Sequence, residues 1–158
     1  MIRAYHPGDL EAVVDIGNRA WRGIYAMFRE IYGEELFRLI NPEPSTSKGK
    51  QIRGHCLKHP GWIFICERDG KIAGFITFWL EKDKKIGVIG NNAKDPDCPL
   101  KGIGQEMYSA VFDYFKKEGM LYAQVHTGLD PAHSPARKAY ESAGFNIRHD
   151  EAVYYRKL

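Results

Sequence analysis

The sequence predicts an α+β fold in which a central mixed, mostly antiparallel β-sheet is flanked by helices. Three observations lead to this prediction. Apolar residues recur at helical spacing through most of the first 58 residues, extended runs joined by tight turns occupy residues 62–94, and helical and extended segments alternate from residue 105 onward. The predicted order is β-α-α-α-β-β-β-α-β-α-β-β, and 158 residues fit one domain spanning residues 1–158.

The N-terminal part of the chain predicts a short strand followed by three helices. Residues 2–5 are the strand, and in the turn that follows Asp9 is placed to cap the first helix. That helix ends near Ala20, and two more helices follow over residues 25–40 and 47–58. The apolar stripe of the first helix has the spacing of one helix face: Leu10, Val13, Val14 and Ile16.

The middle of the chain predicts an antiparallel meander of three strands. Residues 62–66 are β-branched and aromatic, and Asp69-Gly70 forms a hairpin turn because that pair tolerates the positive φ of tight turns. Residues 72–80 return as the second strand. After a turn at Asp83-Lys84, residues 86–94 form the third strand.

The C-terminal part predicts helices and strands in alternation. An amphipathic helix covers residues 105–118, a strand follows over 121–127, and a short helix runs from 135 to 143 with Ser134 as its N-cap. Two closing strands complete the predicted sheet: residues 145–148 and 153–157.

Composition excludes several classes of protein. The chain is 13% aromatic with a net charge of only +3, unlike a disordered chain. No apolar run reaches the roughly 18–20 residues that span a bilayer. The N-terminal residues lack the apolar segment of a signal peptide, and three cysteines do not make a disulfide framework. We therefore expect a cytoplasmic protein, and the mild basic excess suits an anionic ligand.

The segment from Lys94 to Gln105 carries the first chemical signal, because it joins a strand to a helix through Gly102 and Gly104. Glycine allows a close backbone approach to a ligand, and a helix start offers unpaired N–H groups. Together they hold a phosphate or pyrophosphate, with Lys101 as a nearby cation. The same pattern also occurs in simple tight turns, and no Gly-Lys-Ser/Thr follows as in a Walker loop.

A second motif lies in residues 133–145, which read HSPARKAYESAGF. In this order, the two segments resemble the GNAT superfamily of N-acetyltransferases, over nearly the whole chain. The first matches at Gly102-x-Gly104, and the second matches in a short helix and the residues after it: Ala136, Tyr140, Gly144 and Phe145. The resemblance implies a three-layer GNAT-like fold and an acyltransferase that moves the acetyl group of acetyl-CoA to a primary amine.

The resemblance also implies which residues contact acetyl-CoA. They lie at the end of a strand, in the glycine loop and at the start of the short helix: Ala93, Lys94, Leu100, Lys101, Gly102, Ile103, Gly104, Gln105, His133 and Ala136. Tyr140 stands where the family has the tyrosine that protonates the departing CoA thiolate. A bulge at Asn91-Asn92 is expected to expose a backbone N–H for the acetyl carbonyl. Two positions depart from the family pattern: Pro99 replaces Gln or Arg, and His133 replaces Asn.

The general base and the pocket for the acceptor amine are predicted less directly. His126 shares a strand face with Gln124, and histidine exchanges protons readily near neutral pH, so His126 is the candidate base. Glu81 and a bound water are the alternatives. The resemblance places the acceptor pocket at the first two helices, with these candidates to bind the acceptor: Trp21, Tyr25, Phe28, Trp79 and Asn92.

The sequence also bears on two other functions, an acyl-CoA sensor and a nucleic-acid binder. The departures at Pro99 and His133 suit a non-catalytic acyl-CoA sensor, whereas Tyr140 argues for catalysis. A nucleic-acid binder has no supporting signature. His55 and His59 have a spacing that can bind zinc, but no third ligand adjoins them, so no metal is predicted. The acceptor is a small-molecule or peptide amine, we expect no membrane partner, and a homodimer through the closing strands is possible.

Overall fold

The computed structural model describes all residues 1–158, and it confirms a mixed, mostly antiparallel sheet flanked by helices. The sheet has five strands in the order β1-β2-β3-β4-β5, antiparallel except for the parallel pair β4 and β5. Their bounds are β1 (Ile2–Ala4), β2 (Ile63–Arg68), β3 (Lys71–Glu81), β4 (Ile86–Lys94) and β5 (Tyr122–Val125).

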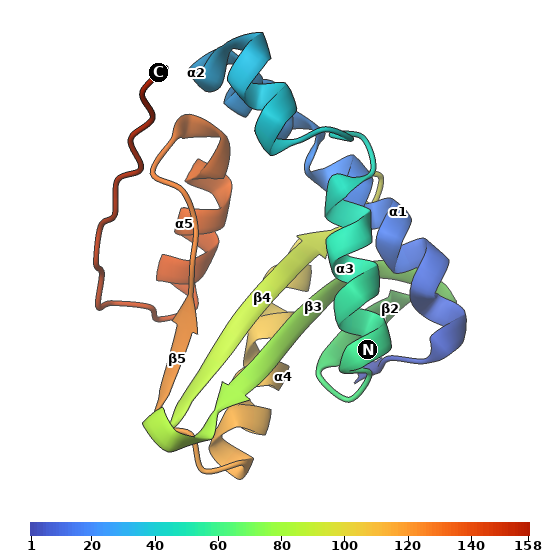
Figure 1. Cartoon of the computed structure of the whole chain (residues 1–158). Coiled ribbons are helices and arrows are strands. Elements are labelled where there is room, and N and C mark those ends of the chain that lie inside the picture. Colours follow the sequence, from blue (N-terminus) through green and yellow to red (C-terminus); the bar gives the residue numbers. More distant parts are fainter.

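Five α-helices and three short 3-10 turns complete the chain. The helices are α1 (Leu10–Ala20), α2 (Arg22–Ile40), α3 (Ser47–Lys58), α4 (Ile103–Lys117) and α5 (Ser134–Ser142), and the 3-10 turns are η1 (Pro7–Asp9), η2 (Lys82–Lys84) and η3 (Pro131–His133). Figure 1 shows α1 and α3 on one face of the sheet and α4 on the other, which makes three layers. No helix is long and apolar enough to cross a membrane.

Each face of the sheet carries its own hydrophobic core. Val13 of α1 and Ile52 of α3 pack with Phe75 of the sheet on one face. On the other face, Met107 and its neighbours on α4 pack against a second set of sheet residues that includes Ile76, Phe78 and Ile89. Because successive side chains of β3 point to opposite faces, both cores require apolar residues there. This explains the unbroken buried run from residue 73 to 78.

An irregularity in the β3–β4 pairing opens one end of the sheet. Ile76 pairs with Asn92 and Phe78 pairs with Ile89, so β4 contains one more residue than β3 over this stretch. A β-carbon added at Gly90 would lie 2.7 Å from Thr77 Oγ1, so the position requires glycine. The pairing of β4 with β5 ends at Ile89. The expected bulge is therefore confirmed, beginning at Gly90 before the two asparagines.

The two closing strands are the main difference from the prediction. Residues 145–148 and 153–157 form no strand, and all residues from 146 to 158 are exposed. A strand forms only against a partner edge. Here the tail instead follows α5 toward α2, as Figure 1 shows. Tyr155 packs edge-on against Tyr32 with ring centroids 5.4 Å apart, and Lys157 forms an ion pair with Glu35 at 2.7 Å.

Of the two predicted helix caps, Ser134 is wrong, and Asp9 occupies the N-cap position of α1 but does not cap it through its side chain. Ser134 lies inside α5, and the residue at the cap is His133. Asp9 makes no side-chain bond to the start of α1. Its carboxylate instead accepts from the backbone N–H of His6 at 2.8 Å and forms an ion pair with Arg3 at 2.8 Å. Short polar side chains at helix starts have several competing backbone partners, and tertiary contacts decide among them.

Packing of α4 on the sheet predicts a steric effect at Gly87. A β-carbon there would lie 2.4 Å from the Phe115 ring, which is fully enclosed in the core. We expect Gly87→Ala to lower the free energy of unfolding by about 1–3 kcal/mol through overpacking, measured by urea denaturation. Gly54→Ala on α3 is the control, since nothing lies within 4 Å of its new methyl group. It should stabilise the helix by about 0.5–1 kcal/mol. Equal changes in the free energy of unfolding for the two variants would contradict a steric clash at Gly87.

Candidate active site

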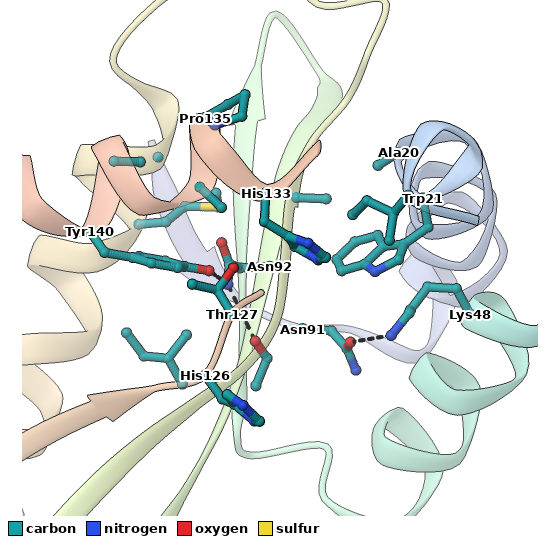
Figure 2. Close-up of a pocket in the computed structure, with 18 of the residues that line it drawn as sticks. Ala20, Trp21, Lys48, Asn91, Asn92, His126, Thr127, His133, Pro135 and Tyr140 are labelled. Carbon is teal, nitrogen blue, oxygen red and sulfur yellow. Dashed lines mark hydrogen bonds between the residues drawn. The ribbon is translucent and has the colours of Figure 1, made fainter. Parts of the chain in front are cut away.

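A large cavity lies where β4 and β5 diverge. Its volume is about 1020 Å³, and it is lined by the α1–α2 junction, α3, the second half of β4, the end of β5 and α5. Figure 2 shows Tyr140 on one side and Lys48 and Trp21 on the other, with Asn91 and Asn92 of β4 between them. The bulge produces the cavity, because it ends the pairing that would otherwise close the sheet at this point.

The open edge of β4 presents backbone donors to the cavity. Beyond the bulge, the N–H of Asp95 donates to the Ala73 carbonyl at 2.8 Å, toward β3. N–H groups of an antiparallel strand alternate in direction, so those of Lys94 and Asn92 point the other way. No strand pairs with β4 on that side after Ile89. These N–H groups are therefore available to an oxygen atom bound in the cavity.

Asn92 links two buried tyrosines at the cavity wall. The Tyr108 hydroxyl donates to Asn92 Oδ1 at 3.0 Å, and Asn92 Nδ2 donates to the Tyr140 hydroxyl oxygen at 3.1 Å. Since Tyr140 accepts from Asn92, its own hydrogen is free to be donated into the cavity. Burial raises the pKa of Tyr140, and the bond from Asn92 offsets part of the rise. Tyr140 is thus a protonated donor at neutral pH.

The start of α4 has the geometry of an anion site. Gly102 adopts φ 82° and ψ −10°, a left-handed conformation, and no atom lies within 4 Å of where its side chain would be. The N–H of Glu106 bonds to the Gly102 carbonyl at 3.1 Å. The N–H groups of the first helical residues have no partner within α4: Ile103, Gly104 and Gln105.

Arg19 of α1 fixes the loop that leads to this helix start. Its guanidinium donates to Asp95 at 2.8 Å and to Asp97 at 2.9 Å. The hydrogen bond from Arg19 holds the pKa of Asp95 below its ordinary value. At the other end, the Gln105 side chain donates to the Ala139 carbonyl at 3.0 Å and ties α4 to α5. The loop is therefore held by both layers of helices.

The structure brings most of the predicted cofactor-contact residues to this region in two groups. Five line the cavity: Ala93, Lys94, Gly104, His133 and Ala136. The other five lie outside its lining, at the loop and helix start: Leu100, Lys101, Gly102, Ile103 and Gln105. The second group adjoins the unpaired N–H groups of α4, as a separate phosphate contact would require.

His133 has a defined orientation at the cavity edge. Its backbone N–H donates to Asp130 Oδ1 at 3.0 Å, and its Nδ1 lies 2.7 Å from the same carboxylate. Burial acts to raise the pKa of Asp130, but these bonds outweigh it and lower the pKa. His133 Nδ1 therefore has its partner, and the ring also packs against Phe28 with centroids 6.1 Å apart.

The predicted acceptor-binding aromatics all line the cavity wall: Trp21, Tyr25, Phe28 and Trp79. His126 and Gln124 line it too, on one side of β5 and its extension. The His126 side chain is 83% exposed, and its Nε2 lies 3.7 Å from the Glu151 carboxylate. Glu81 also lines the wall but is ion-paired with Lys84 at 2.7 Å.

Sequence reasoning missed Lys48, the half-buried cation of this cavity. Its Nζ donates to Gln51 at 2.6 Å and to Asn91 at 3.1 Å, and it lies 4.7 Å from the Trp21 ring centroid. Burial lowers the pKa of Lys48 to about 8. The residue lies at the start of the predicted helix over residues 47–58, where no pattern distinguishes it from other lysines. Only the docking of α3 beside the bulge reveals its position.

The histidines of α3 do not form a metal site. The rings of His55 and His59 have centroids 5.4 Å apart, and His59 stacks on Trp62 at 5.0 Å. No group of three His, Cys, Asp or Glu side chains is placed to hold a metal ion.

Comparison with known proteins gives a consistent family. The profile of the acetyltransferase (GNAT) family matches residues 21–145. The mycothiol acetyltransferase of Thermomonospora curvata is 26% identical over 95 residues, which are 60% of this chain and 31% of that protein. The chain spans between 30% and 51% of the length of the mycothiol acetyltransferases that it matches.

Solved structures share the fold. PaiA N-acetyltransferase from Thermoplasma acidophilum, in complex with coenzyme A, has a TM-score of 0.70 at 21% identity, covering 96% of this chain and 92% of that one. The aminoglycoside acetyltransferase meta-AAC0020 from an uncultured soil metagenomic sample, in complex with sisomicin, has a TM-score of 0.59 at 15% identity, covering 100% and 95%. At these identities the likeness is one of fold.

Lys48 predicts a pH dependence of stability. Its folded-state pKa of about 8 lies below the ordinary value of 10.5. Between these values the unfolded chain holds a proton on Lys48 that the folded chain has released, so stability must rise with pH. We expect the free energy of unfolding of the wild type, relative to Lys48→Met, to increase from pH 8 to 10.5 and to be level below pH 8. Urea denaturation of both proteins across this pH range measures the difference in their free energies of unfolding. The same dependence on pH in both proteins would contradict the burial of the Lys48 charge.

Proposed function

The chain belongs to the acetyltransferase (GNAT) family, and from that premise we propose that it transfers the acetyl group of acetyl-CoA to a primary amine by direct attack. The observation that carries the proposal is the Tyr140 hydroxyl, which accepts from Asn92 and keeps its hydrogen free at the cavity between β4 and β5. A non-catalytic site would have no need of a proton donor beside the open strand edge.

The residues present fit the cosubstrate. Acetyl-CoA supplies an activated thioester, and its pyrophosphate suits the unpaired N–H groups that follow Gly102, where the left-handed backbone leaves open space. Lys101 adds a positive charge beside them. Ala93 and Lys94 of β4, with His133 and Ala136 from the opposite wall, border the cavity between this site and Tyr140. We assign the extended arm of the molecule to that space.

Three steps are then divided among the chain's own groups. The unpaired N–H groups of Asn92 and Lys94 stabilise negative charge on the acetyl carbonyl oxygen, because fixed dipoles in a partly dry site need no reorganisation. Tyr140 donates its proton to the sulfur as the carbon–sulfur bond breaks. His126, at the acceptor end, takes the proton that the attacking amine loses.

The acceptor site favours amines with an apolar or aromatic body. Trp21, Tyr25, Phe28 and Trp79 surround it, and apolar walls disfavour the charged form of a bound ammonium. The neutral amine is the nucleophile, so this desolvation promotes attack. An acyl-CoA sensor is the second candidate, motivated by Pro99, which lacks the N–H of other residues. The two candidates differ in whether thiol is released.

The proton-donor role of Tyr140 predicts a selective loss of rate. We expect Tyr140→Phe to retain its affinity for acetyl-CoA and to lower kcat about 10²–10⁴-fold, because the hydroxyl acts mainly as charge develops on sulfur. Thiol release from acetyl-CoA with a panel of primary amines measures kcat, and calorimetry measures affinity.

Tyr108→Phe is the comparison variant, because it removes a neighbouring buried hydroxyl that helps to hold Asn92 and Tyr140 but is not the proposed donor to sulfur. Its kcat should change by less than about tenfold, given that a neutral hydrogen bond contributes about 0.5–1.5 kcal/mol. A Tyr140→Phe enzyme within about twofold of wild type would exclude the role. Absence of thiol release from the wild type with every amine would favour the sensor.

The base role of His126 predicts a change in the pH profile. If His126 accepts the proton, kcat/KM rises with pH along an acidic limb, and His126→Ala loses that limb. Gln124→Ala, on the same side of β5, should keep the limb even if the reaction slows, because its side chain does not titrate. An identical acidic limb in wild type and His126→Ala would reject the role and leave Glu81 or a bound water.

A further inference from the structure

We propose that Lys48 binds an anionic oxygen group of the acceptor, so that the preferred acceptors are amines that also carry a carboxylate. This inference rests on the proposed function and names the acceptor class of that same site. The proposed acceptor has an apolar or aromatic body, an amine and a carboxylate. Polycationic amines, which an acidic pocket would select, are not expected to be preferred.

The hydrogen bonds of Lys48 leave one donor unused. A lysine ammonium has three N–H donors. Two of them are directed to the side-chain oxygens of Gln51 and Asn91, at 2.6 and 3.1 Å. Both partners are neutral, and Lys48 forms no salt bridge, unlike Lys50 and Lys157, which pair with glutamates. A half-buried ammonium without a counter-charge is an unfavourable arrangement that an anionic ligand relieves.

The position of Lys48 directs it at the acceptor and not at the cosubstrate. Figure 2 shows Lys48 reaching from α3 to Asn91, on the side of the cavity opposite Tyr140. The start of α4, where a pyrophosphate fits, is formed by other residues, none of which contacts Lys48 through a hydrogen bond. An acceptor whose amine lies near Asn92 can therefore place an adjacent carboxylate at the ammonium, since Lys48 bonds to Asn91, the next residue of β4.

The charge balance of the cavity supports an anion. Its lining contains two lysines, Lys48 and Lys94, and a single carboxylate, Glu81. Glu81 is already paired with Lys84 at 2.7 Å, so it offers little attraction to a cationic acceptor. Asp130, behind the wall, is occupied by His133. An acceptor with several ammonium groups would thus meet a fixed like charge and no free carboxylate, which disfavours it.

The neighbouring groups define the rest of the acceptor. Trp21 lies beneath the ammonium at 4.7 Å from its ring centroid, and the ring holds the Lys48 side chain in place by a cation–π contact. Gln51 and Asn91 fix the ammonium from the other side. A carboxylate bound here forms a charge-assisted hydrogen bond in a partly desolvated site, where such bonds are stronger than in water.

The test compares acceptors that differ only in the carboxylate: tryptophan with tryptamine, and phenylalanine with phenethylamine. We expect the wild type to have the lower KM for the carboxylate member of each pair, and Lys48→Met to reduce that preference roughly tenfold to hundredfold, the usual range for hydrogen bonds to charged groups. Lys50→Met is the matched control on α3, since its ammonium pairs with Glu43 outside the cavity and its loss should preserve the preference. Lys48→Gln replaces the methionine variant if that one does not fold.

A binding measurement separates this inference from the proposed function. Calorimetry with 3-phenylpropionate, a carboxylate without an amine, needs no turnover. The inference is supported if the wild type binds 3-phenylpropionate and Lys48→Met binds it at least about tenfold more weakly. This result would hold even if no acetyl transfer were detected. Equal binding to both proteins, or a wild type that prefers tryptamine and phenethylamine, overturns it. If none of the amines leads to thiol release, the proposed acetyl transfer is rejected, and the calorimetric result alone decides whether Lys48 binds a carboxylate.

Discussion

The extra residue in β4 opposite Thr77 is the constraint on which the rest of the site depends. Without it, β4 would continue to pair with β5, and both strand edges would be satisfied by each other. With it, pairing with β5 ends at Ile89, and the N–H groups of Asn92 and Lys94, which point away from β3, lack a strand partner. Unpaired backbone groups away from bulk water are costly, so the arrangement persists because Gly90 fits closely against Thr77 and the two cores hold the sheet on either face.

The polar groups around this opening are arranged so that each buried one is satisfied while a donor stays free. Asn92 accepts from Tyr108 and donates to Tyr140, which orients the Tyr140 hydroxyl by an interaction that does not use its hydrogen. No buried side-chain nitrogen or oxygen is left without a partner. A network of this kind is rigid, because any movement of one member leaves another unpaired in a low-dielectric setting. The Tyr140 hydroxyl is thus positioned by the same side chain that lies next to the bulge.

The fold is shared with proteins that hold chemically different bound molecules, so the distinguishing information lies in the lining of the cavity. The compared structures include one bound to coenzyme A and one bound to sisomicin, an aminoglycoside. Similar architecture does not transfer an acceptor from one to another, since function resides in the side chains of the site. In this chain the lining includes four aromatics, three from the α1–α2 region and Trp79 from β3, and the Lys48 ammonium of α3, whose hydrogen-bond partners are both neutral.

The sequence by itself determined the elements whose signals are local. The Asp69-Gly70 turn, the helix at residues 47–58 and the strand at 86–94 appear as predicted, because turn conformation and side-chain periodicity depend on neighbouring residues. The glycine loop and Tyr140 were found in the same way, from short motifs. Tertiary structure decided the rest. Residues 145–148 and 153–157 have strand-like composition but find no partner edge. Lys48 meets Asn91, and Asn92 meets Tyr140, across more than forty residues of chain. Such contacts form only when separate elements pack together, and no local pattern encodes which of many lysines or tyrosines the packing will bring to the cavity.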